Sequence, residues 1–203
     1  MTKSALQIAR AAYQPKLPKG LTGTVKAVAG AATQSVADQE EIKKLFPNTY
    51  GMPLIKFENT DETVDFPAMN VGVILSGGQA PGGHNVISGI FDGIKKLNKD
   101  SKLYGFILGP GGLVDHNYME LTADIIDEYR NTGGFDIIGS GRTKLEKEEQ
   151  FEKGLEILKE LNIKALVIIG GDDSNTNACV LAEYYAAKNC GVQAVSYTHL
   201  TLP

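Results

Sequence analysis

Residues 166–178 read LVIIGGDDSNTNA, an apolar run that ends in two glycines and is followed at once by two aspartates. The apolar part is typical of a buried strand, and the polar part opens a predicted helix over residues 174–188. A strand that ends at Gly170 and Gly171 would place Asp172 and Asp173 at the carboxyl end of a sheet, where ligands bind in open α/β folds.

The two adjacent carboxylates repel each other, and two interpretations explain why the chain keeps them. Asp173 or Ser174 can serve as the N-cap of the helix, and one acid near a helix N-terminus is stabilising. Alternatively, one carboxylate faces Mg²⁺, which prefers one or two carboxylates together with water and substrate phosphate oxygens. A pair of acids favours the metal interpretation, while the residues alone leave capping open.

Two further loops have the composition of phosphate sites. Residues 76–85, SGGQAPGGHN, follow a predicted strand at 69–75 and precede a helical pattern that runs from Val86 to Leu97. Their glycine amides can approach an anion at a helix N-terminus, although the loop is neither a Walker A motif nor G-x-G-x-x-G, and a βα turn without a ligand remains possible. Residues 139–144, GSGRTK, follow a predicted extended piece at 135–138 and carry Arg142 and Lys144. These two cations are suited to binding phosphate, and the alternative interpretation is a solvated surface loop.

Strands alternate with helices from Met69 onward. Strands are predicted at 69–75, 103–109 and 164–171, and helices at 122–130, 151–161 and 174–188, which indicates a doubly wound α/β fold with a mostly parallel sheet and helices on both faces. If the strands before Gly77 and Asp172 are neighbours, these two residues lie close together. Residues 1–68, with short helices predicted at 4–13 and before Pro47, are interpreted as an extension packed on a core domain at 69–193.

The composition is that of an ordinary soluble protein, with 42% hydrophobic and 22% charged residues and a formal net charge of −4. This balance argues against nucleic acid as a partner, and the absence of a long apolar run or a signal core argues against a membrane and favours the cytoplasm. Cys179 and Cys190 are interpreted as small buried apolar residues. His84 and His116 are assigned to loops, and His199 to a tail that spans 194–203.

The three motifs, in this order and spacing, resemble the phosphofructokinase family and in particular its long, pyrophosphate-dependent branch, over residues 3–193. The resemblance implies Mg²⁺-dependent, reversible phosphoryl transfer from pyrophosphate to fructose 6-phosphate, giving the 1,6-bisphosphate in glycolysis. It also implies a homo-oligomer, a dimer or higher.

Site residues follow from the resemblance position by position. Asp172 would hold the metal ion, and Asp173 would select the donor, because ATP-using relatives commonly have glycine there. The expected donor-binding residues are Gly77, Gly78, Arg142, Lys144, Gly171 and Ser174.

The likeness ends after Gln193, where the family has Pro-Lys-Thr-Ile-Asp-Gly-Asp, including the general base, and this chain reads AVSYTHLTLP. We therefore expect an incomplete fold with a foreign tail, and a chain that is inactive as written. Three alternatives remain: an ATP-dependent 6-phosphofructokinase, a non-catalytic regulatory subunit of the same family, and a kinase for NAD or diacylglycerol with a similar acidic loop. The glycine-rich and GSGRTK loops fit the last alternative poorly.

Overall fold

The computed structural model of the chain describes residues 3–18 and 22–198. It forms two compact units, one made of residues 1–13 with 67–203 and the other of residues 14–66. His199, which the sequence analysis assigns to the tail, lies outside the described residues. Within the described ranges, no helix has both the length and the apolar character needed to cross a membrane.

The larger unit is built on a five-stranded sheet in the order β5-β4-β3-β6-β7. Strands β4, β3, β6 and β7 are parallel, and β5 pairs with β4 in the antiparallel sense. Their bounds are β3 Asn70–Leu75, β4 Lys102–Phe106, β5 Tyr118–Glu120, β6 Ile163–Ile169 and β7 Gln193–Tyr197. The strands predicted at 69–75, 103–109 and 164–171 are therefore confirmed as β3, β4 and β6, and β3 lies at the centre of the sheet. Strands β5 and β7 were not predicted, and most of β7 lies in the segment 194–203 that the sequence assigns to a tail.

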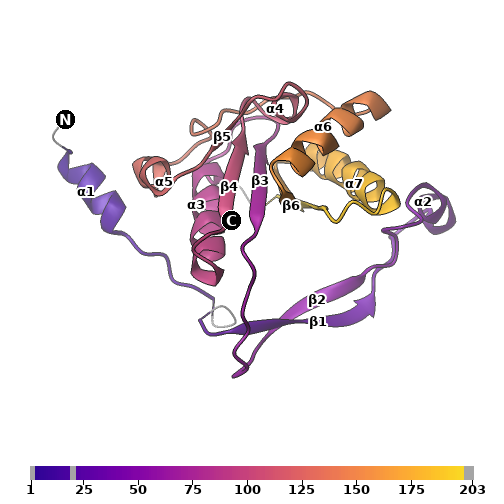
Figure 1. The fold of residues 1–203 in the computed structure, drawn as a ribbon, viewed down its shortest axis with the longest axis horizontal. Helices are drawn as coiled ribbons and strands as arrows, with labels where there is room; N and C mark the ends of the chain where they lie inside the picture. The colour runs from indigo at the N-terminus through magenta and orange to yellow at the C-terminus, as the bar shows by residue number, and fades with distance from the viewer. Residues whose placement is uncertain (1–2, 19–21, 199–203) are drawn as a thin grey trace. The chain divides into compact units, whose positions relative to one another are not determined.

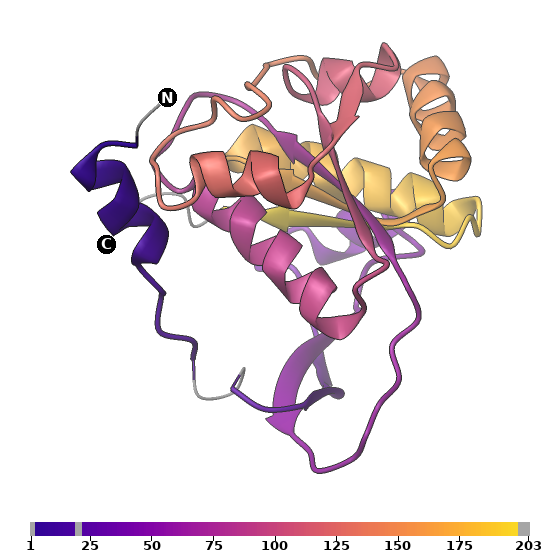
Figure 2. The same cartoon turned by 60° about the vertical axis from the view of Figure 1, so that its left-hand side comes forward.

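Helices cover both faces of this sheet (Figures 1 and 2), as predicted. One face carries α3 (Gly83–Leu97) and α5 (Ala123–Tyr129), and the other carries α4 (Pro110–Val114), α6 (Glu148–Glu160) and α7 (Asp172–Ala187). The alternation of side chains along each strand divides the core accordingly: Val73 and Leu75 of β3 belong to the α3–α5 cluster, and Ile74 belongs to the other.

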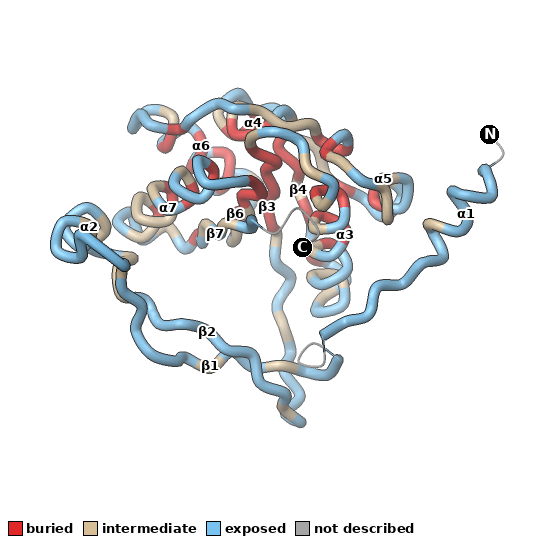
Figure 3. Tube along the Cα trace, turned by 180° about the vertical axis from the view of Figure 1, so that it is seen from behind, coloured by how far each residue is buried: buried red, intermediate tan, exposed pale blue. Residues whose placement is uncertain are grey.

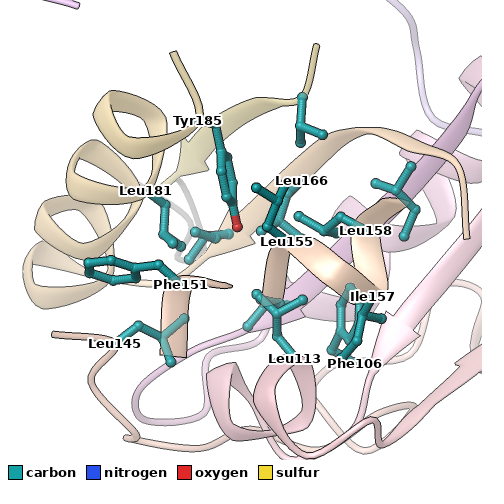
Figure 4. Close-up of a cluster of buried hydrophobic side chains, with 14 of the residues drawn as sticks. Phe106, Leu113, Leu145, Phe151, Leu155, Ile157, Leu158, Leu166, Leu181 and Tyr185 are labelled. Atoms are coloured by element: carbon teal, nitrogen blue, oxygen red, sulfur yellow. The ribbon is translucent and has the colours of Figure 1, made fainter. Parts of the chain in front are cut away.

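The apolar cluster under α6 and α7 is the larger of the two and is drawn in Figure 4. It includes Leu145, which directly follows the GSGRTK motif and is 1% exposed. Burial of a leucine side chain is worth roughly 1.5–3 kcal/mol. The motif is thus attached at its carboxyl end to the hydrophobic core.

The smaller unit consists of a two-stranded antiparallel sheet, β1 (Val25–Ala32) with β2 (Pro53–Asn59), and the short helix α2 (Gln39–Leu45). None of its described residues is buried (Figure 3). The sequence analysis predicted α2 and also helix α1 (Ala5–Ala12), which belongs to the larger unit, but it did not predict this hairpin. The packing of residues 1–68 on the core stays a prediction.

Four local expectations are wrong. Cys179 is exposed rather than buried. Residues 135–138 form a turn rather than an extended piece, because the N–H of Gly139 donates to the carbonyl of Phe135 at 2.8 Å. Helix α7 begins at Asp172 rather than Ser174, and His84 lies in the first turn of α3 and is buried rather than in a loop.

Candidate functional site

The turns that follow β3 and β6 emerge side by side, because these strands are parallel neighbours whose last residues, Leu75 and Ile169, pair with each other. The N–H of Ser76 donates to the carbonyl of Ile169 at 2.8 Å, which extends the sheet by one residue. The strands that precede Gly77 and Asp172 are therefore neighbours, which was the condition for these residues to lie close together. The glycine-rich and acidic loops meet at the carboxyl edge of the sheet.

A pair of buried hydroxyl groups joins the two loops. Ser174 is 4% exposed and its hydroxyl donates to that of Ser76, itself 8% exposed, at 2.8 Å. A Cβ on Gly77 would lie 3.9 Å from Oγ of Ser174. Ser174 therefore lies where the sequence analysis predicted it, but its contacts are with the protein, and a contact with the donor stays a prediction.

The GSGRTK segment is the third part of the site. Gly141 forms a parallel bridge with Ser76, and its carbonyl accepts the N–H of Gly77 at 2.9 Å. Gly77 has a φ of +90°, a conformation that glycine adopts without strain. A Cβ on Gly78 would lie 3.3 Å from Nη2 of Arg142, so the guanidinium lies directly beside the glycine turn.

Asp172 and Asp173 occupy the first turn of α7, and both are exposed. The N-cap is Gly171, and no side chain caps this end of the helix, so the interpretation of Asp173 or Ser174 as a cap is wrong. The helix N-terminus favours both negative charges. Nζ of Lys144 lies 4.0 Å from Oδ2 of Asp173, an exposed pair that contributes little to stability.

The acidic pair suits Mg²⁺ better than a metal held by protein alone. Among the described residues, no three His, Cys, Asp or Glu side chains are grouped as metal ligands. Asp172 and Asp173 are both exposed and supply hard carboxylate oxygens at the carboxyl edge of the sheet. Such a donor set fits an ion that keeps several waters and shares phosphate oxygens with its substrate.

Two polar residues near the site were missed by the sequence reasoning. The side chain of Asn177 in α7 bonds to both backbone groups of Leu145. Nδ1 of His84 lies 2.7 Å from Oγ1 of Thr132, and Nε2 accepts the N–H of Ile137 at 3.1 Å. Burial lowers the pKa of His84, against the opposing influence of Asp136 and Thr132. A histidine after a glycine turn and an asparagine inside a helix both read as ordinary polar residues, so the sequence contained no signal for these contacts.

Comparisons with known proteins identify the family of this chain. Residues 70–196 match the phosphofructokinase family. The chain is 67% identical over 195 residues to pyrophosphate–fructose 6-phosphate 1-phosphotransferase from Porphyromonas gingivalis, covering 96% of this chain and 36% of that protein. It is 48% identical to the protein of the same name from Entamoeba histolytica, with 92% and 35% covered. The chain thus spans about a third of the length of these relatives.

The solved structures show the same fold. The pyrophosphate-dependent phosphofructokinase from Nitrosospira multiformis superposes with a TM-score of 0.58 at 20% identity, over 64% of this chain and 33% of that one. The match to the phosphofructokinase family, at residues 70–196, includes all five strands of the larger sheet and the loops at its carboxyl edge. The chain therefore belongs to the phosphofructokinase family.

Proposed function

We propose that the protein containing this chain transfers a phosphoryl group between pyrophosphate and fructose 6-phosphate, reversibly and with Mg²⁺. Relatives that carry this activity in their names share up to 67% of its residues over 195 positions. The observation that carries the proposal is the junction of the glycine turn after β3 with the acidic first turn of α7, closed by the 2.8 Å bond between Ser76 and Ser174.

Phosphoryl transfer depends mainly on positioning and charge neutralisation, and the site offers both. In our proposal, the backbone N–H groups of Gly78 and Gly171 receive the donor phosphates, and Arg142 and Lys144 neutralise their charge. The N–H of Gly77 is donated to the carbonyl of Gly141 at 2.9 Å, so Gly77 shapes the turn and does not offer this N–H to the donor. Asp172 holds Mg²⁺, which when bound screens the phosphate charge and orients the phosphoryl group. The general base expected from the family is not among these residues.

Donor choice is assigned to Asp173. Its side chain is 86% exposed at the start of α7, and its Oδ2 lies 4.0 Å from Nζ of Lys144, one of the two cations assigned to the donor phosphates. A negative charge there opposes the further phosphate of a nucleotide donor and tolerates the smaller pyrophosphate. Cytoplasmic location and a homo-oligomeric state stay predictions.

The test replaces Asp173 with glycine in the full-length protein and measures kcat/KM with pyrophosphate and with ATP, each with fructose 6-phosphate. We expect the wild type to prefer pyrophosphate and D173G to shift that preference toward ATP by at least about tenfold, the effect of 1.4 kcal/mol. Asp100→Gly, at an exposed loop position away from the site, is the matched control. An unchanged preference in D173G contradicts the role of Asp173, and a wild type that uses only ATP contradicts the proposed donor.

A further inference from the structure

We propose that Asn177 is a positioning residue for donor binding: its side-chain amide holds the segment that presents Arg142 and Lys144 to the donor phosphates. This inference rests on the proposed function, because it assigns a purpose to that segment. Asn177 is not itself assigned a contact with the phosphate donor. It acts through its hydrogen bonds to the backbone of Leu145.

The side chain of Asn177 makes two hydrogen bonds to the backbone of Leu145, and we call this pair of bonds the grip. Oδ1 of Asn177 accepts the N–H of Leu145 at 3.2 Å, and Nδ2 donates to the carbonyl of the same residue at 2.6 Å. Both polar groups of that backbone position are thus satisfied by one side chain, in the way that a neighbouring strand would satisfy them. A two-point contact fixes orientation as well as distance, which a single hydrogen bond does not.

The segment is held at its other end by the sheet. Gly141 bridges to Ser76, and its carbonyl accepts the N–H of Gly77 at 2.9 Å. Only Arg142, Thr143 and Lys144 lie between the two anchors, and all three are exposed. Because their side chains are not packed in the core, their placement depends on the backbone that carries them.

The grip also couples this segment to the acidic turn. Asp173 and Asn177 are four residues apart in α7 and therefore lie on the same face of the helix. Lys144 directly precedes the gripped residue, and its Nζ lies 4.0 Å from Oδ2 of Asp173. One helix thus carries the two acids and, one turn later, the side chain that sets the position of the opposing cations.

A purely structural role for Asn177 predicts a different result from a positioning role. Loss of a structural contact lowers stability and affects both substrates alike. Loss of the grip lets the Arg142–Lys144 span drift, which weakens the contacts to the donor and leaves the sugar phosphate untouched.

The experiment uses the full-length protein with Asn177→Ala and Asn177→Leu, which remove the same two hydrogen bonds while leaving side chains of different volume. KM and kcat are measured separately for pyrophosphate and fructose 6-phosphate, and pyrophosphate binding is measured by calorimetry. We expect both variants to lose roughly tenfold to hundredfold in kcat/KM for pyrophosphate, the scale of a small misplacement of a binding group. KM for fructose 6-phosphate should change less than about twofold, within the spread expected for uncoupled sites.

Val192→Ala is the matched control, because Val192 is 8% exposed in the same apolar cluster as Leu145 but belongs to neither loop. It should lower the melting temperature without a selective effect on the donor. The inference is overturned if the donor KM of both Asn177 variants equals that of the wild type, or if V192A reproduces their kinetics. If the wild type uses ATP instead of pyrophosphate, the proposed function is wrong, and the inference on Asn177 is tested with KM and kcat for ATP. If the wild type binds neither donor, the proposed function and the inference are both wrong.

Discussion

At the scale of single residues, the two glycines that end β6 face opposite steric demands. A Cβ on Gly170 would lie 2.3 Å from Oγ of Ser174 and 2.5 Å from the carbonyl oxygen of Ser76, whereas a Cβ on Gly171 would meet nothing within 4 Å. Gly170 is therefore required by the packing of the site loops. Gly171, the exposed N-cap of α7, is not required in this way.

We accordingly expect Gly170→Ala to destabilise the protein by about 3 kcal/mol, the upper end of the usual cost of overpacking, because a backbone carbonyl cannot move aside. Gly171→Ala should leave stability within about 0.5 kcal/mol of the wild type, as for other unconstrained surface positions. Urea unfolding of the two variants measures both effects, provided that the free energy of unfolding depends equally on urea concentration in each. Equal stabilities for G170A and G171A would contradict the close approach of the two serines to Gly170.

Tyr185 presents the opposite situation, a polar atom with too few contacts. Its ring is 1% exposed, its hydroxyl points into the apolar cluster (Figure 4), and among the described residues the hydroxyl has no hydrogen-bond partner. Burial raises the pKa of this phenol. An unsatisfied buried hydroxyl costs about 1–3 kcal/mol.

Tyr185→Phe should therefore leave the free energy of unfolding unchanged or raise it by about 1 kcal/mol, because it removes the unpaired group and keeps the ring. Tyr118→Phe, at a half-buried strand position, serves as the comparison and should show no gain. Thermal unfolding checks the pair. A loss of more than about 1 kcal/mol in Y185F would reveal a partner for the hydroxyl, such as a buried water.

At the scale of elements, the sequence predicted what local pattern determines. Apolar runs closed by glycine defined β3, β4 and β6, and helical spacing defined α3, α5 and α6. The sequence left the order of the strands in the sheet open, because no local pattern indicates that β3 pairs with both β4 and β6. The neighbourhood of Gly77 and Asp172 followed once that order was known.

The elements that were missed depend on contacts between distant residues. Phe135, Ile137 and Ile138 have the composition of a strand, yet they form a turn, in which the N–H of Gly139 donates to the carbonyl of Phe135 and the N–H of Ile137 donates to Nε2 of the buried His84. The hairpin β1–β2 has a weak pattern, since β1 is rich in alanine and no described residue of either strand is buried. The grip of Asn177 on Leu145 spans 32 positions in sequence.

The buried His84 makes the junction of α3 with residues 132–137 sensitive to pH. Burial lowers its pKa below the ordinary value of about 6.5, so the unfolded chain takes up this proton before the folded chain does. The contribution of His84 to stability is complete above about pH 6.5 and is lost as the pH falls below that value, with a slope of at most about 1.4 kcal/mol per pH unit.

Urea unfolding between pH 7.5 and 5 should show this slope in the wild type and a shallower one in His84→Gln. His116→Gln is the control, because His116 is exposed in the turn before β5 and should keep the wild-type slope. The difference between the variants isolates the contribution of His84 to the pH dependence from that of the other residues. Identical slopes in the wild type and H84Q would show that the imidazole is not buried as a neutral ring.

At the scale of the whole molecule, the two units differ in how much apolar surface they bury. The larger unit has two hydrophobic clusters on either side of its sheet, whereas Leu54, Ile55 and Phe57 in β2 are 56%, 50% and 62% exposed. A two-stranded hairpin without a covered face is marginally stable in water. Local stability should therefore be unequal along the chain.

Hydrogen exchange followed by mass spectrometry should show this contrast. Amides of β1 and β2 are expected to exchange through local opening, at least about a hundredfold faster than those of β3 and β6, which open only with the larger unit. Peptides from α6 provide an internal reference for a helix over the core. Equal protection of β2 and β3 would show that the apolar side chains of β2 are covered in solution.

The contrast between Asp173, which is 86% exposed, and its neighbour Ser174, which is 4% exposed, has a consequence for how this fold diversifies. Ser174 is held by its hydrogen bond to Ser76, whereas the exposed Asp173 at the adjacent position can be exchanged with little penalty in folding. Given the role proposed for Asp173, a single substitution at this position would change the preferred phosphate source without compensating changes in the interior.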